Sequence, residues 1–126
     1  MPYLNCKLSV EESADIAEQV AKILLKNTSE ILGKKAEVTA INIEFVSPKY
    51  WFVGNTSNKE SFFLDIKITE DTNTKEQKSE YINRVYKDMK NILGEIDPTS
   101  YIVIDDVRSD SWGYDGFTQE YRFKGV

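Results

Sequence analysis

The chain has 126 residues and a formal net charge of −5 at pH 7, a length that fits one domain over residues 1–126. The acidic balance argues against nucleic acid as a partner, because binding to phosphates depends on concentrated lysine and arginine. The absence of histidine excludes Ser–His triads, Cys–His pairs and most transition-metal sites, and the sequence contains no metal-ligand cluster.

Proline 2 directly follows the initiator methionine and precedes an alternating, strand-like run over residues 3–8. If Met1 is removed, the chain begins with a secondary amine. A terminal amine titrates near ~8 in water, and burial disfavours its charged form, so such a group can accept a proton at cellular pH. Pro2 is therefore a candidate general base. The structural alternative is that the first residue of a strand simply tolerates proline, because it need not donate to the sheet.

The single cysteine, Cys6, lies within this run and cannot form an internal disulfide, which suits a reducing cytoplasm. Its alternating context predicts a buried structural thiol. No apolar run approaches the length of a membrane span, and the first residues lack the segments of a secretion signal. We therefore expect a cytoplasmic protein without a membrane partner.

The two halves of the chain resemble each other, and each predicts a strand, a helix and a second strand. The repeats run from about residue 2 to 60 and from about 61 to 126. The matching segments are Leu4–Ser9 with Leu64–Thr69, Ile31–Gly33 with Ile92–Gly94, and Trp51 with Trp112. A helical crossover makes the strands within each half parallel.

The helices and second strands are predicted from caps and apolar spacing. Capping boxes are expected at Ser9/Glu12 and Thr74/Gln77, and the helices are expected to end at Gly33 and Gly94. Residues 38–46 and 100–107 alternate as half-buried strands do. The predicted apolar stripes are Ile16, Val20, Ile23, Leu24 and Ile31 in the first helix, and Ile82, Val85, Met89 and Leu93 in the second.

This order of elements also occurs in ferredoxin-like and RNA-recognition domains. An RNA-recognition sheet would need exposed stacking aromatics beside basic residues, which are not evident here. The connection over residues 47–61 is long for a compact domain and carries Pro48 and Gly54, which indicates a functional or interface loop.

A proline after Met1 at the head of a tandem β-α-β unit resembles the tautomerase superfamily. The nearest branches are those of macrophage migration inhibitory factor and 5-carboxymethyl-2-hydroxymuconate isomerase, and the resemblance covers nearly the whole chain. Its further matches are Gly33-Lys34, the loop Trp51–Asn55, and Tyr101–Ile104 followed by Trp112-Gly113-Tyr114. The resemblance implies an α+β (α/β sandwich) protomer with pseudo-twofold symmetry, a four-stranded mixed sheet with two helices on one face, and a homotrimer.

The same resemblance implies cofactor-independent keto–enol proton transfer on a small α-keto acid or enol, with Pro2 as base and then acid. Lys34 matches the lysine that binds the substrate carboxylate, and Tyr101 matches a pocket tyrosine supplied across the subunit boundary. Tyr101 is equally a candidate for cross-strand packing. Lys67 matches a position that offers a backbone amide to the substrate, while its side chain also suits a solvated strand end.

Trp51, Phe52 and Tyr114 are expected either to wall the pocket or to form interface core. Arg108 lies beyond the last strand, where it could reach a pocket or remain a surface arginine. The chain departs from the family where arginines grip dicarboxylates, because those positions hold Ala40 and Tyr101, and Val103 replaces a pocket asparagine.

Three hypotheses follow. The first is a tautomerase-like isomerase acting through Pro2. The second is a tautomerase-fold binding or assembly protein whose catalytic site has decayed, which the missing arginines motivate. The third is a ferredoxin-like binding domain.

Overall fold

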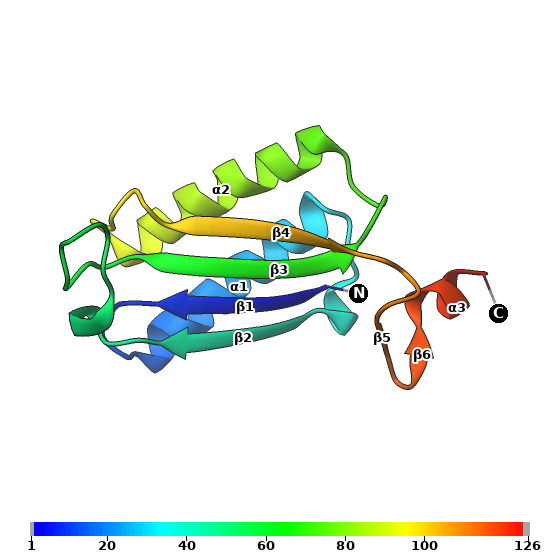
Figure 1. The fold of residues 1–126 in the computed structure, drawn as a ribbon, viewed down its shortest axis with the longest axis horizontal. Helices are drawn as coiled ribbons and strands as arrows, with labels where there is room; N and C mark the ends of the chain where they lie inside the picture. The colour runs from blue at the N-terminus through cyan, green and yellow to red at the C-terminus, as the bar shows by residue number, and fades with distance from the viewer. Residues whose placement is uncertain (1, 125–126) are drawn as a thin grey trace.

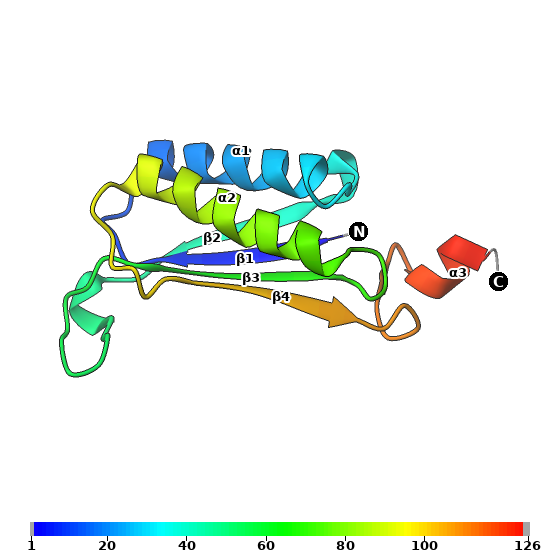
Figure 2. The same cartoon turned by 90° about the horizontal axis from the view of Figure 1, so that it is seen from above.

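The computed structural model describes residues 2–124, in which a four-stranded sheet carries both long helices on one face (Figures 1 and 2). The strands are β1 (Tyr3–Leu8), β2 (Ala40–Phe45), β3 (Phe62–Thr69) and β4 (Tyr101–Val107), and the helices are α1 (Ala14–Glu30) and α2 (Lys75–Leu93). The order across the sheet is β2-β1-β3-β4. The predicted α+β fold with a mixed sheet is confirmed.

The pairing of the strands shows how the two halves join. β1 pairs with β2 and β3 pairs with β4 in parallel, as predicted, while β1 and β3 are antiparallel. Leu4 pairs with Ile66, which is the repeat counterpart of Cys6, and Cys6 pairs with Leu64, which is the repeat counterpart of Leu4. This is the pseudo-twofold relation expected from the repeat. In a ferredoxin-like domain, another strand lies between the two parallel strands of each β-α-β unit. Here β1 is adjacent to β2 and β3 is adjacent to β4, so the ferredoxin-like alternative is wrong.

Alternation along the central strands builds the core. Leu4, Cys6 and Leu8 of β1 are fully buried under the helices, as are the alternate residues of β3 from Phe62 to Ile68. Burial raises the pKa of the Cys6 thiol to about 12, so this thiol is neutral, as predicted for a structural cysteine. The opposite face of the sheet, which carries Tyr3 and Lys7, is not covered by a helix (Figure 2).

The second helix begins and ends as predicted, but the first does not. Thr74 and Gln77 form a capping box, and Gly94 caps the end of α2 with φ 84°. The N-cap of α1 is Ser13, whereas the hydroxyl of Ser9 donates to the carbonyls of Lys59 and Ser61. The capping box predicted at Ser9 and Glu12 is therefore wrong, because a tertiary contact uses that hydroxyl.

Two other boundaries differ from the prediction. The first helix ends at Glu30, before Gly33, whose φ of 68° allows the turn that follows. The second strand begins at Ala40, because residues 36–38 form a short 3-10 helix, η1 (Ala36–Val38). The predicted stripe of α2 is wrong at Ile82, which is 41% exposed, while Tyr81 is buried in its place.

Tyr81 bonds to α1 through one buried contact, its hydroxyl lying 2.9 Å from that of Thr28. Tyr81→Phe is expected to lower the free energy of unfolding by about 1–3 kcal/mol, because it leaves the Thr28 hydroxyl buried without this partner. Urea unfolding measures the loss. The double variant Thr28→Val/Tyr81→Phe removes both polar groups and is expected to recover part of it. Unchanged stability of Tyr81→Phe would contradict the role given to this bond.

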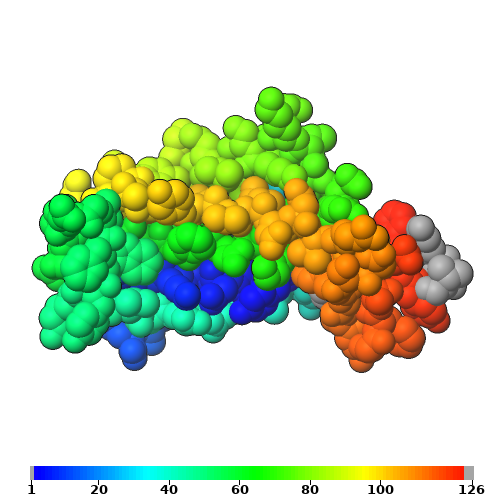
Figure 3. Space-filling view, in the orientation of Figure 1, coloured from blue at the N-terminus to red at the C-terminus, as the bar shows by residue number. Residues whose placement is uncertain are grey.

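The two ends of the sheet differ. At one end the loop after β2 contains the 3-10 helix η2 (Pro48–Tyr50). At the other, the chain leaves β4 and forms a projection made of β5 (Gly113–Tyr114), β6 (Phe117–Thr118) and α3 (Gln119–Lys124) (Figures 1 and 3). Within residues 2–124, none of the helices has the length and apolar character needed to cross a bilayer.

Candidate functional site

A cleft of about 550 Å³ opens beside Pro2, at the end of the sheet where the C-terminal segment projects (Figure 1). Four stretches of the chain line it: residues 2–3, residues 37–40, Lys67 of β3, and residues 112–114. The cleft therefore unites Pro2, Lys67 and Tyr114, three of the residues that the sequence singled out.

The register of the sheet fixes the position of Pro2. Tyr3 pairs with Ala40 on one side and with Lys67 on the other. The carbonyl of Pro2 accepts a hydrogen bond of 3.3 Å from the amide of Ala40, which anchors the start of the strand. Pro2 is buried. A proline held in this way by the backbone has little freedom to leave the cleft.

Lys67 is the only basic side chain among the cleft-lining residues of the described chain, and it is ion-paired. Its Nζ lies 2.9 Å from Oδ2 of Asp105 and 4.0 Å from Oδ2 of Asp65. The hydrogen bond from Lys67 to Asp105, with the charge of Asp65, raises the pKa of the ammonium group. Lys67 is therefore a charged group at cellular pH, partly neutralised by two carboxylates.

The C-terminal segment forms the aromatic wall of the cleft. Trp112 and Tyr114 flank Gly113, where a Cβ would lie only 1.9 Å from the carbonyl oxygen of Phe117. Only glycine allows this close approach between β5 and β6. The guanidinium of Arg122 stacks 3.8 Å from the centre of the Tyr114 ring and donates to the Tyr114 carbonyl at 2.9 Å.

Sequence reasoning missed this support. Arg122 lies eight residues after Tyr114, and that spacing corresponds to no local pattern. Trp112 belonged to the motif Trp112-Gly113-Tyr114 but was not proposed as a site residue. Its Nε1 is buried without a hydrogen-bond partner among residues 2–124.

Five predicted site residues lie outside the cleft of their own chain, and Lys34 and Arg108 are two of them. Lys34 donates from Nζ to Oγ1 of Thr72 at 2.7 Å, and burial lowers its pKa, an effect that Asp106 partly opposes. Arg108 is held on the surface by two hydrogen bonds to Asp110, 3.1 and 2.9 Å long. Arg108 in turn holds the pKa of the Asp110 carboxyl low, at about 2.

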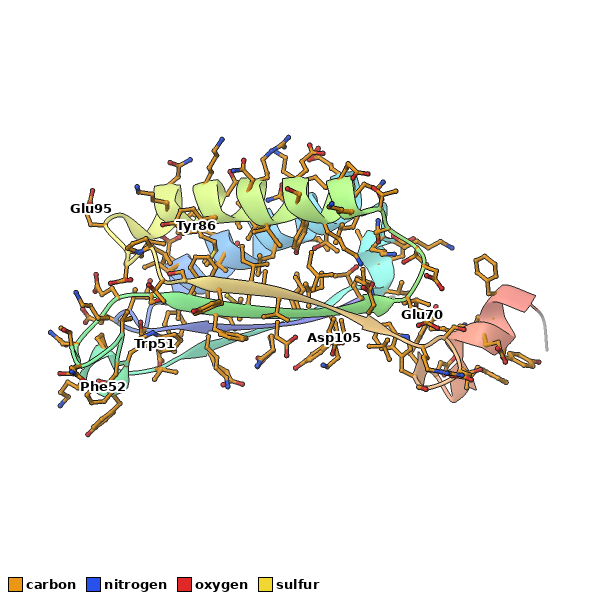
Figure 4. The ribbon with its side chains drawn as sticks, turned by 45° about the horizontal axis from the view of Figure 1, so that its top comes forward. Trp51, Phe52, Glu70, Tyr86, Glu95 and Asp105 are labelled. Carbon is orange, nitrogen blue, oxygen red and sulfur yellow. The ribbon has the colours of Figure 1, made fainter. Side chains whose placement is uncertain are left out.

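The remaining three, Trp51, Phe52 and Tyr101, lie toward the other end of the sheet. Tyr101 lies at the start of β4 and pairs with Phe63 of β3. Phe63 is four residues before Lys67, so the two lie about 13 Å apart along the strand. Figure 4 shows Trp51 and Phe52 at the end opposite Asp105. A single chain therefore does not bring these aromatic side chains to Pro2.

Comparison with known proteins agrees with this architecture. The family model described as tautomerase enzyme matches residues 63–118, the half of the chain that does not contain Pro2. A probable tautomerase, K2, from Dickeya dadantii (strain 3937) is 39% identical over 54 residues, which cover 43% of this chain and 81% of that protein. The chain belongs to the tautomerase superfamily.

Solved structures share the fold at low sequence identity. Pt0534, in a form inactivated by 2-oxo-3-pentynoate, superposes with a TM-score of 0.87 at 13% identity over 95% of this chain and 98% of its own. A macrophage migration inhibitory factor-like protein from Entamoeba histolytica gives 0.79 at 23% identity over 93% and 97%. A fused 4-OT described as a symmetric trimer gives 0.85 at 13% identity over 94% and 96%.

Proposed function

We propose that this protein is a cofactor-independent isomerase that moves a proton between carbon and oxygen of a small α-keto acid and its enol, with Pro2 as general base and then acid. The observation that carries the proposal is the buried position of Pro2 in a cleft that also holds a charged lysine. Membership in the tautomerase superfamily supports the reaction class.

The chemistry requires a neutral amine at the start. Once Met1 is removed, burial disfavours protonation of the Pro2 nitrogen and leaves its lone pair available. In the ketonising direction, the amine takes the proton of the enol hydroxyl, the carbonyl forms, and the resulting ammonium returns a proton to the adjacent carbon. One group can serve both steps because the second reverses the change in protonation made by the first.

Lys67 is the group we assign to the negative charge of the substrate. Its ammonium can bind the carboxylate or the enolate that develops in the transition state, where an electrostatic contact contributes most. Trp112 and Tyr114 contribute aromatic surface to the cleft beside Pro2, which favours the neutral form of the amine.

We further propose a cytoplasmic homotrimer of one-domain chains. An exposed sheet edge, together with the exposed side chains of Tyr3, Tyr101 and Val103 on the uncovered sheet face, favours association, and fused 4-OT structures of the same fold are trimers. In such an assembly Tyr101, Trp51 and Phe52 of one chain approach the Pro2 cleft of its neighbour. Lys34 and Arg108 are bonded to Thr72 and Asp110 in the isolated chain, and each retains further N–H donors for a site completed by a neighbouring chain.

The test combines intact mass with an enol assay on one sample. Protein shown to lack Met1 is expected to accelerate the ketonisation of phenylenolpyruvate, followed by ultraviolet absorbance. A form that carries one extra residue ahead of Pro2 is the matched control and is expected to be inactive, because an amide nitrogen has no basic lone pair. Equal activity of the two forms would contradict the proposed role of the amine.

A second candidate is a tautomerase-fold binding or assembly protein without turnover. The neutralisation of Lys67 by two aspartates, and the presence of Ala40 in the cleft wall, favour it. This candidate predicts that protein verified to lack Met1 ketonises no enol substrate.

A further inference from the structure

We propose that Asp105 determines which acids enter the cleft, by restricting it to substrates with a single carboxylate and excluding dicarboxylates. The inference rests on the proposed function, because it concerns the substrate of the same site. Two observations support it: the ion pair between Asp105 and Lys67, and the excess of carboxylates over cations around the cleft.

The ion pair is built into the sheet. Lys67 and Asp105 are register partners on the adjacent parallel strands β3 and β4. Asp65 lies two residues before Lys67, on the same face of β3. Figure 4 shows Asp105 projecting from the sheet on the side away from the helices. The strand register therefore places a carboxylate against the ammonium group of every folded chain.

The pair is accessible to a competing anion. In the isolated chain the side chain of Lys67 is 41% exposed and that of Asp105 is 48% exposed, so neither charge is sealed by its own chain. A substrate carboxylate can replace Asp105 on Lys67, because it exchanges one ion pair for another of the same kind. When a monocarboxylate binds in this way, its charge is paired with Lys67. The carboxylate of Asp105 loses its partner but is solvated.

Among the described residues that line the cleft, Lys67 is the one cation, so a second carboxylate of the substrate meets no other. Glu37 lines the cleft, and Asp65 and Asp105 flank Lys67. A dicarboxylate therefore adds a negative charge to a region that already holds three carboxylates and one ammonium. Like charges within a few ångströms repel, and partial burial strengthens the effect.

Asp106 provides a matched control. It follows Asp105 directly and bears the same charge, but it forms its ion pair with Lys78 of α2. Asp106→Asn removes one negative charge from the same strand end without releasing Lys67. A difference between Asp105→Asn and Asp106→Asn thus reports the contact with Lys67 rather than net charge.

The experiment measures binding by isothermal titration calorimetry to protein without Met1. The ligands are 2-oxopentanoate and 2-oxoglutarate, which have equal chain length and differ by one carboxylate. The unsubstituted protein is expected to bind 2-oxopentanoate more tightly. Asp105→Asn is expected to increase the affinity for 2-oxoglutarate by about three- to tenfold and the affinity for 2-oxopentanoate by less. Asp106→Asn is expected to leave the ratio of the two affinities unchanged.

Two results would overturn the inference. One is binding of 2-oxoglutarate by the unsubstituted protein as tightly as 2-oxopentanoate, or binding of neither. The other is an equal change of the affinity ratio in both aspartate variants. Turnover of phenylenolpyruvate, measured separately, decides the proposed function, so the two can fail independently.

Discussion

Pro2→Ala is expected to lower kcat/KM for the ketonisation of phenylenolpyruvate by about 100-fold or more, the range of a positioned general acid–base group. Alanine leaves a primary amine in place of the secondary one and removes the ring that fixes the direction of the nitrogen. The carbonyl of residue 2 still accepts from the amide of Ala40, so the start of β1 is expected to remain in place. Initial rates and circular dichroism on the same preparation measure both effects.

The pH profile separates a chemical role of Pro2 from a structural one. A general base acts only when neutral, so kcat/KM of the unsubstituted protein is expected to fall as pH drops below the pKa of the Pro2 amine. In Pro2→Ala that inflection is expected to move with the basicity of the new amine. A variant with full activity and an unshifted profile would rule out Pro2 as the base.

Phe62→Ala is expected to have the largest effect on stability. The Phe62 side chain is fully buried at the start of β3, and its ring lies 6.2 Å from that of Tyr86 on α2. Its loss leaves a cavity in the core, which costs about 3–5 kcal/mol of unfolding free energy. A domain of this size has about 5–15 kcal/mol in total, so the variant is expected to be close to unfolding at 37 °C.

Phe63→Ala is the matched control, because Phe63 is the next residue on the same strand and faces away from the helices. It is partly exposed and contacts Tyr101 with a ring separation of 6.1 Å. Its replacement is expected to cost much less in the isolated chain. Denaturant unfolding compares the two, and equal losses would contradict the assignment of the core to the helix-covered face.

Periodic features of the sequence predicted the fold well, because burial imposes them locally. The alternation from Leu4 to Leu8 and from Phe62 to Ile68 identifies the covered face of the sheet without reference to any other residue. The cap at Thr74 is also local, since both of its partners lie within four residues. Ser9 shows the limit of this reasoning: its spacing to Glu12 satisfies the capping pattern, but its hydroxyl binds the backbone of a loop fifty residues away.

The candidate site was only partly predictable, because tertiary contacts assemble it. Pro2 was evident from its position, and Lys67 and Tyr114 from the family resemblance. Glu37 and the neighbouring wall of the cleft depend on η1, a short helix that was not predicted. The support of Tyr114 by Arg122 depends on the turn between β5 and β6. No spacing in the sequence indicates either contact.

The antiparallel contact between β1 and β3 has a consequence for stoichiometry. The repeat counterpart of Pro2 is Phe62, which follows Ser61 within the chain and starts its strand at the opposite end of the sheet. Peptide linkage denies that position a free amine. If Met1 is removed as proposed, the two halves therefore differ in chemistry, and an electrophile that modifies the terminal nitrogen adds only once per polypeptide at these equivalent positions.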